Sequence, residues 1–184
     1  MANSPRDVFE INVSLNYVTP PIWRRLLVSP ETDLGDLHVI IQIAMGWTDS
    51  HLHQFIVGND FYGVPDPAFD GEVSDESAIQ IGSLLKKDGD SILYEYDFGD
   101  GWVHTVTLER IRPQQPGEAV PACLAGERSC PLEDVGGPFG YTEFLQVFAD
   151  KTHPEHEEMV DWAGEHFDPE RFDLDDVNKM LAER

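Results

Sequence analysis

The chain begins with a regular alternation of apolar and polar residues. From Phe9 to Tyr17 every second residue is apolar and the residues between them are polar. A period of two residues is typical of a β-strand with one buried face. Pro20-Pro21 interrupts the pattern, and residues 22–28 read as a second strand. The two stretches predict an antiparallel strand pair.

A helical period follows the two predicted strands. Residues 34–45 place Leu37 and Ile41, among other apolar residues, on one helical face. Asp33 is suited to cap the N-terminus of this helix, and Gly46 is suited to end it. The sequence therefore predicts a helix over residues 34–45.

Beyond this helix the pattern is shorter and more broken. Residues 51–57 predict another strand, and residues 58–76 are rich in Gly, Pro and Asp, which indicates a long loop. Residues 83–87 predict a short helical turn.

A hairpin is predicted over residues 91–111. Apolar residues alternate from Ile92 to Phe98 and again from Trp102 to Leu108. Gly99-Asp100-Gly101 lies between the two runs, and glycine accepts positive φ angles at no steric cost. We expect the two strands to pair around this turn.

The last third of the chain changes character. Residues 112–140 hold five prolines and five glycines, which predicts an irregular loop. Helices are predicted at residues 141–149, 154–163 and 173–181. An irregular stretch of this length is expected to be functional or firmly held.

This layout predicts an α+β fold with an antiparallel sheet, the central hairpin, and helices packed on one face or end. We expect a single domain over residues 1–184. Its parts would be a sheet-rich region at about 7–111, the irregular loop at about 112–140 and a helical region at about 141–184.

Composition narrows the functional classes. The 184 residues carry a formal charge of −23, and nucleic-acid affinity comes mostly from Lys and Arg. Direct nucleic-acid binding is therefore disfavoured, and Arg24-Arg25 is too small for a basic footprint. The acidity is explained by solubility or by a basic partner. We find no apolar run that could span a membrane and no signal peptide, so a cytoplasmic location is expected.

Cys123 and Cys130 are the only cysteines. Their spacing permits a disulfide, but cytosolic thiols usually stay reduced. Two cysteines do not complete a zinc site, which normally has four ligands. Structural thiols, a redox pair and half a metal site all remain open.

Three histidines and two aspartates are candidates for a chemical site. His51 and His53 lie two apart on a predicted strand, and His104 lies on the hairpin near Asp97 and Asp100. If they converge, imidazoles and carboxylates would form a divalent-metal or hydrolytic set. Otherwise the histidines are structural and the aspartates cap turn amides.

The aromatic residues of the hairpin and the cation in the long loop complete the candidate set. Tyr96 and Trp102 are interpreted as core residues or as the floor of a groove. Arg128 is expected to pair with a nearby carboxylate, in a loop that folds over the hairpin and forms one wall of that groove. The aromatics of the C-terminal helices are expected to dock these helices onto the sheet or to offer a partner surface.

Several segments together resemble a known family. They are Tyr94-Glu95-Tyr96-Asp97-Phe98-Gly99-Asp100-Gly101-Trp102-Val103-His104, Cys123 to Pro131, Glu133-Asp134-Val135-Gly136-Gly137, Ile22-Trp23-Arg24-Arg25, Gly46 to His53 and Phe167 to Asp173. The chain is similar over nearly its whole length to the plasmid pRiA4b ORF-3-like family. The resemblance implies an association with plasmids or mobile elements, and some relatives carry the label transposon passenger or "resolvase-like". It implies no settled activity.

Two functional hypotheses follow. The first is a non-enzymatic binding or regulatory module that acts through a protein partner. The second is a metal-assisted hydrolase that uses His51, His53, Asp97, Asp100 and His104, with a divalent metal as cofactor. The chain contains neither a kinase motif set nor a phosphate-binding loop.

Overall fold

The computed structural model describes residues 6–65, 73–164 and 166–184. These residues form one eight-stranded sheet in the order β5-β4-β3-β6-β7-β1-β2-β8. The strands are β1 (Asp7–Leu15), β2 (Trp23–Val28), β3 (His53–Val57), β4 (Asp60–Gly63), β5 (Val73–Asp75), β6 (Ser91–Tyr96), β7 (Trp102–Pro113) and β8 (Ala122–Glu127). All neighbours pair antiparallel except β4 and β5, which are parallel.

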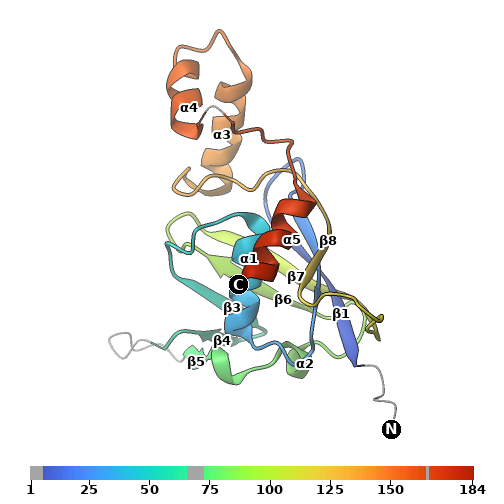
Figure 1. Cartoon of the computed structure of the whole chain (residues 1–184). Coiled ribbons are helices and arrows are strands. Elements are labelled where there is room, and N and C mark those ends of the chain that lie inside the picture. Colours follow the sequence, from blue (N-terminus) through green and yellow to red (C-terminus); the bar gives the residue numbers. More distant parts are fainter. Residues whose placement is uncertain (1–5, 66–72, 165) are drawn as a thin grey trace.

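The helices are α1 (Leu34–Met45), α2 (Ile81–Leu84), α3 (Gly137–Ala149), α4 (His156–Ala163) and α5 (Leu174–Glu183), with a 3₁₀ turn at Glu76–Ala78. In Figure 1, α1 and α5 lie against the sheet, and α3 and α4 stand beyond one end of it. The predicted α+β fold is confirmed. Within the described ranges, no helix is long and apolar enough to cross a membrane.

The centre of the sheet follows from the alternation in β1. This strand lies between β2 and β7, and Ile11 and Val13 are fully buried. Completely burying such a side chain stabilises the fold by about 1.5–3 kcal/mol. The core of the sheet therefore lies under α1, at the strands whose alternation of apolar and polar residues is clearest in the sequence.

Helix α1 has the predicted ends. The Asp33 side chain accepts a hydrogen bond from the Asp36 amide at 2.8 Å. At the other end Gly46 adopts φ +92° and donates from its amide to the Gln42 carbonyl. Both caps satisfy backbone groups that a helix end leaves free. The apolar face between them packs onto the sheet.

The irregular loop predicted for residues 112–140 needs a correction, because β8 lies inside it. This strand pairs antiparallel with β2, and α5 covers it. The Asn178 side chain makes two hydrogen bonds to the backbone of Cys123, at 2.7 and 2.9 Å. The strand consists mostly of small residues, so it lacks the β-branched and aromatic pattern that identifies strands. Its conformation is fixed by pairing with β2 and not by local preference.

Two further expectations are revised. Residues 60–63 and 73–75 of the predicted loop at 58–76 form β4 and β5, while residues 66–72 of that loop lie outside the described residues. The helix predicted at residue 141 begins at Gly137, with Pro138 in its first turn.

The aromatics of the C-terminal helices were expected to dock these helices onto the sheet or to offer a partner surface. Trp162 and Phe167 instead pack on Phe144 of α3, with ring centroids 5.7 and 5.6 Å apart. Phe172 does reach the sheet, because its ring lies under the guanidinium of Arg24 in β2. The helices α3 and α4 thus form a pair held largely by their own contacts.

Candidate functional site

The turn of the β6–β7 hairpin positions the first candidate residue, Asp97. Its backbone has φ +55°, and its side chain accepts hydrogen bonds from the amides of Gly99 and Asp100 at 3.0 and 3.4 Å. The capping role expected of Asp97 is confirmed. Asp100 differs, because its carboxylate accepts from the Gly136 amide in the long loop at 3.1 Å.

That contact joins the hairpin to the segment before α3. A Cβ atom on Gly137 would lie 2.2 Å from the Asp100 carbonyl oxygen, so only glycine permits this approach. The expected folding of the loop over the hairpin is therefore observed at the Gly136-Gly137 pair. It places the carboxylates of Glu133 and Asp134 near the hairpin turn.

His51, Asp97 and Asp134 meet at this junction. The Nδ1 atom of His51 lies 3.7 Å from Asp97 Oδ1, and its Nε2 atom lies 3.4 Å from Asp134 Oδ1. One nitrogen of His51, one carboxylate oxygen of Asp97 and one of Asp134 all lie within 4.8 Å of one another. The three residues come from three separate segments, and we call them the His51 cluster.

A hydrogen-bonded network borders the His51 cluster. The Tyr96 hydroxyl donates to Glu133 at 2.6 Å and accepts from the Ser50 amide at 3.0 Å. Thr48 donates to the same carboxylate from its hydroxyl at 2.5 Å. Burial raises the pKa of Tyr96, whereas for Glu133 the hydrogen bonds from Thr48 and Tyr96 outweigh burial and lower the pKa. Glu133 is therefore held as a carboxylate.

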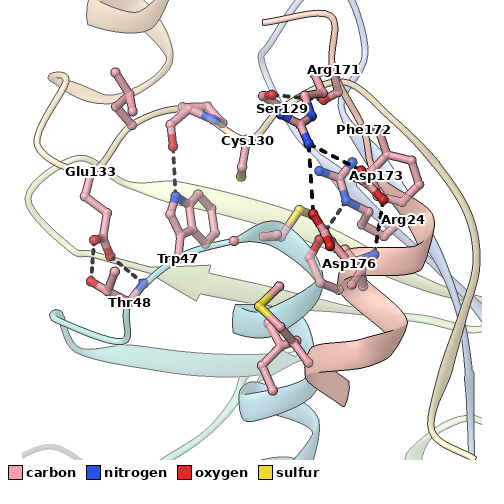
Figure 2. Close-up of a pocket in the computed structure, with 18 of the residues that line it drawn as sticks. Arg24, Trp47, Thr48, Ser129, Cys130, Glu133, Arg171, Phe172, Asp173 and Asp176 are labelled. Carbon is pink, nitrogen blue, oxygen red and sulfur yellow. Dashed lines mark hydrogen bonds and ion pairs between the residues drawn. The ribbon is translucent and has the colours of Figure 1, made fainter. Parts of the chain in front are cut away.

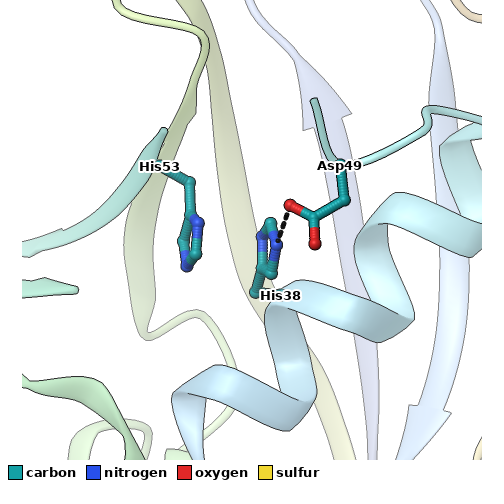
Figure 3. Close-up of side chains that lie close together, drawn as sticks. All are labelled: His38, Asp49 and His53. Carbon is teal, nitrogen blue, oxygen red and sulfur yellow. Dashed lines mark hydrogen bonds and ion pairs between the residues drawn. The ribbon is translucent and has the colours of Figure 1, made fainter. Parts of the chain in front are cut away.

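His53 lies outside the His51 cluster and stacks on His38 of α1. Their ring centroids are 3.4 Å apart and their planes differ by 4° (Figure 3). Asp49 lies 2.9 Å from Nε2 of His38, and Glu76 lies 2.8 Å from Nε2 of His53. Burial first, and then the neighbouring His53, lower the pKa of His38.

These stacked rings fit a hydrogen-bonded arrangement with their acidic and phenolic neighbours better than a metal centre. An imidazole nitrogen binds a metal through a lone pair in its ring plane. Two parallel rings at stacking distance cannot both direct such lone pairs at one ion. The nitrogens of the stack also face Asp49, Glu76 and the Tyr94 hydroxyl.

His104 is a core residue. It is fully buried and packs against the rings of Tyr94 and Trp47 at 5.3 and 5.2 Å. Its Nδ1 atom lies 3.3 Å from the Tyr94 carbonyl, and burial lowers its pKa to about 4. Trp102 is also fully buried. The structure thus brings together His51 and Asp97 of the candidate set, and not His53 or His104.

The cysteines and Arg128 line another part of the molecule. Cys123 and Cys130 are free, and burial raises the pKa of both thiols. Arg128 forms the expected ion pair, with Glu170. None of the three belongs to a group of metal-ligating side chains in the described parts of the chain.

Arg24 is buried beside these cysteines, at the edge of a cavity of about 570 Å³ (Figure 2). Its guanidinium donates to the carbonyls of Ala44, Glu127 and Arg128, each at 2.8 Å. It therefore connects the end of α1 to the end of β8. Arg25, the next residue along β2, pairs instead with an acid, Glu109.

A second cavity, of about 360 Å³, lies between α3 and α4. We call it the α3–α4 groove. Its apolar residues are Val135, Phe144, Val147, Met159 and Trp162, and its acidic residues are Asp134, Glu143, Glu155 and Glu158. No lysine or arginine lines it, as far as the structure describes the chain.

Sequence reasoning missed several of these residues. His38, Asp49 and Glu76 carry no motif, and only the fold brings them to His53. Asp134 was visible in the segment Glu133 to Gly137 that carries the family resemblance. Its meeting with His51 depends on the close approach of Gly137 to the hairpin.

Comparisons with known proteins agree with one another. The sequence model of the plasmid pRiA4b ORF-3-like protein family matches residues 7–176. An uncharacterized protein y4hQ of Sinorhizobium fredii is 37% identical over 177 residues, which are 95% of this chain and 91% of that protein. A crystal structure of a protein of unknown function from Methanosarcina mazei Go1 has a TM-score of 0.86 and 37% identity. The match covers 95% of this chain and 99% of that one.

Proposed function

The chain belongs to the plasmid pRiA4b ORF-3-like family, and from that premise we propose that it is a cytoplasmic, non-enzymatic binding module. Its partner would be a protein, which presents a basic amphipathic helix to the α3–α4 groove. The two similar proteins are themselves an uncharacterized protein and a protein of unknown function. The proposal rests on one observation, which is an apolar groove with an entirely acidic rim.

The floor of the groove offers an anchor for an apolar side chain. Trp162 remains 47% exposed although its edge packs on Phe144, and Met159 lies beside it. Tryptophan and methionine are enriched where proteins bind one another. Amphipathic helices commonly dock their apolar face in such grooves.

The rim selects the charge of the partner. Glu143, Glu155, Glu158 and Asp134 surround the floor, and the formal charge of the whole chain is −23. Complementary charge accelerates association and suppresses wrong partners. A helix with Lys or Arg beside its apolar face therefore fits, whereas an acidic helix or a phosphate backbone would be repelled.

A metal-assisted hydrolase has less support. That hypothesis requires His51, His53, Asp97, Asp100 and His104 at one centre. His53 lies in the stack with His38, His104 lies in the core, and Asp100 contacts Gly136. We therefore favour the binding role.

The test is a selection from a random peptide library against the purified protein. The comparison variant carries Glu155→Lys and Glu158→Lys, which reverse the charge of the rim. The matched control carries Glu157→Lys and Asp161→Lys, which make the same charge change on α4 outside the groove.

We expect enriched peptides with basic residues and large apolar residues at helical spacing. They should bind the rim variant at least tenfold more weakly than the wild type, and the control variant much less so. A selection without enriched peptides would contradict the proposal. Equal loss in both variants would also contradict it, because affinity would then follow net charge and not the groove.

A further inference from the structure

We propose that the His51 cluster binds one divalent cation of the manganese or zinc class, which joins the hairpin turn to the loop before α3. The inference does not depend on the occupant of the α3–α4 groove. It rests on the geometry of His51, Asp97 and Asp134 and on the charge around them.

The spacing of the three side chains fits a single ion. Divalent manganese and zinc bind nitrogen and oxygen at about 2.0–2.2 Å, so two ligands of one ion lie roughly 3–4.4 Å apart. Asp97 lies beside Nδ1 of His51 and Asp134 beside its Nε2, so only one of these nitrogens would bind the ion. One ligand atom from each of the three residues nevertheless lies within 4.8 Å of the other two. Small side-chain rotations would complete the site.

The charge around the cluster also calls for a cation. The imidazole of His51 is surrounded by three carboxylates, those of Asp97, Asp134 and neighbouring Glu133. Among the described residues, no lysine or arginine is paired with any of the three. The Asp97 side chain is only 9% exposed. The amides of Gly99 and Asp100 offset part of the cost of burying this carboxylate, and a bound cation would offset more of it.

His51 also offers a nitrogen atom that is free to bind a metal ion. Its Nε2 atom is buried and has no hydrogen-bond partner among the described residues, although it faces Asp134. An imidazole nitrogen in this position is a ligand for transition metals, and the two carboxylates also suit manganese. Water would fill the remaining positions, because Asp134 is 76% exposed and the cluster opens to solvent on that side.

The cation would have a structural consequence. Asp97 belongs to the hairpin turn, His51 precedes β3, and Asp134 precedes α3 and also lines the α3–α4 groove. An ion held by all three would fix the loop that leads to α3. The glycine contact at Asp100 already brings these segments together, and the ion would lock them.

The experiment titrates the metal-free protein with Mn²⁺ and follows the electron paramagnetic resonance signal of the free ion. Excess Mg²⁺ is present to occupy the general acidic surface. The test variants are Asp134→Asn, whose exposed side chain leaves the fold intact, and His51→Gln. The matched controls are Asp49→Asn and His53→Gln, which make the same changes in the stacked pair.

We expect saturable binding of one equivalent of Mn²⁺ in the wild type and both controls. Affinity should fall at least tenfold in both test variants, and circular dichroism should confirm that they are folded. Zn²⁺ should displace Mn²⁺. Absence of saturable binding would overturn the proposal. Binding lost in the controls and kept in the test variants would also overturn it, because the ion would then occupy the stacked pair.

Discussion

Arg24 connects three parts of the fold. We expect its replacement by methionine to lower the free energy of unfolding substantially. The side chain is 2% exposed and donates to carbonyls at the end of α1 and at the end of β8. Its guanidinium also lies 4.4 Å from the centroid of the Phe172 ring. Arg24→Met keeps most of the apolar stem but removes every donor.

The size of the effect follows from these contacts. Hydrogen bonds from a charged donor contribute about 1.5–3 kcal/mol each. Three long-range bonds would contribute roughly 5–9 kcal/mol, but burying the guanidinium costs several kcal/mol. We therefore expect the free energy of unfolding to fall by about 3 kcal/mol. For a chain of this size that lowers Tm by about 6–12 °C.

The assay is urea unfolding followed by circular dichroism, with Arg25→Met as the matched control. Arg25 lies next along the same strand, and it pairs with Glu109 at the surface. Exposed ion pairs contribute about 0–1 kcal/mol, so the control should unfold almost as the wild type does. A loss below about 1 kcal/mol for Arg24→Met would refute the reasoning, since the carbonyls would then have found other donors.

Two further variants test the core and the junction. Burial lowers the pKa of His104 to about 4, below its ordinary value of 6.5. Between these pH values the unfolded state therefore binds more protons than the folded state. The free energy of unfolding should fall by up to about 3 kcal/mol as the pH drops from 6.5 to 4. His104→Phe should flatten that part of the stability curve in urea unfolding, and an unchanged slope would contradict a neutral core histidine. Gly137→Ala should cost more than about 2 kcal/mol, because its Cβ would meet the Asp100 carbonyl at φ +70°. Gly136→Ala, with φ +92° but no such close contact, should cost about 1 kcal/mol; equal losses in thermal unfolding would contradict the close approach.

The parts of the fold that sequence reasoning predicts are those with a strong local pattern. The alternation in β1 and in the β6–β7 hairpin, and the capped period of α1, are all observed near their expected bounds. In these segments local preference and tertiary packing agree. The strand β8 was missed because its small residues carry no strand signal, and pairing with β2 decides its conformation.

The site was harder to predict because it depends on contacts between distant segments. The sequence identified His51 and Asp97, but it grouped them with His53 and His104. The strand partners of β6 and the packing of α1 divide these histidines between the turn, the stack and the core. The α3–α4 groove was foreseen only as the alternative in which the aromatics of the C-terminal helices offer a partner surface, because the packing of Trp162 on Phe144 joins two helices and leaves no local sequence pattern.

The most direct test of the binding role is the fluorescence of Trp162 during titration with a basic amphipathic peptide of lysine and leucine. Of the four tryptophans, Trp162 is 47% exposed, Trp23 is half-buried, Trp47 is 8% exposed and Trp102 is fully buried. We predict that the peptide shifts the emission to shorter wavelengths in a saturable way. The shift should disappear in Trp162→Phe, and a peptide with serine in place of leucine should not produce it. Unchanged emission, or the same shift in Trp162→Phe, would contradict the proposed groove.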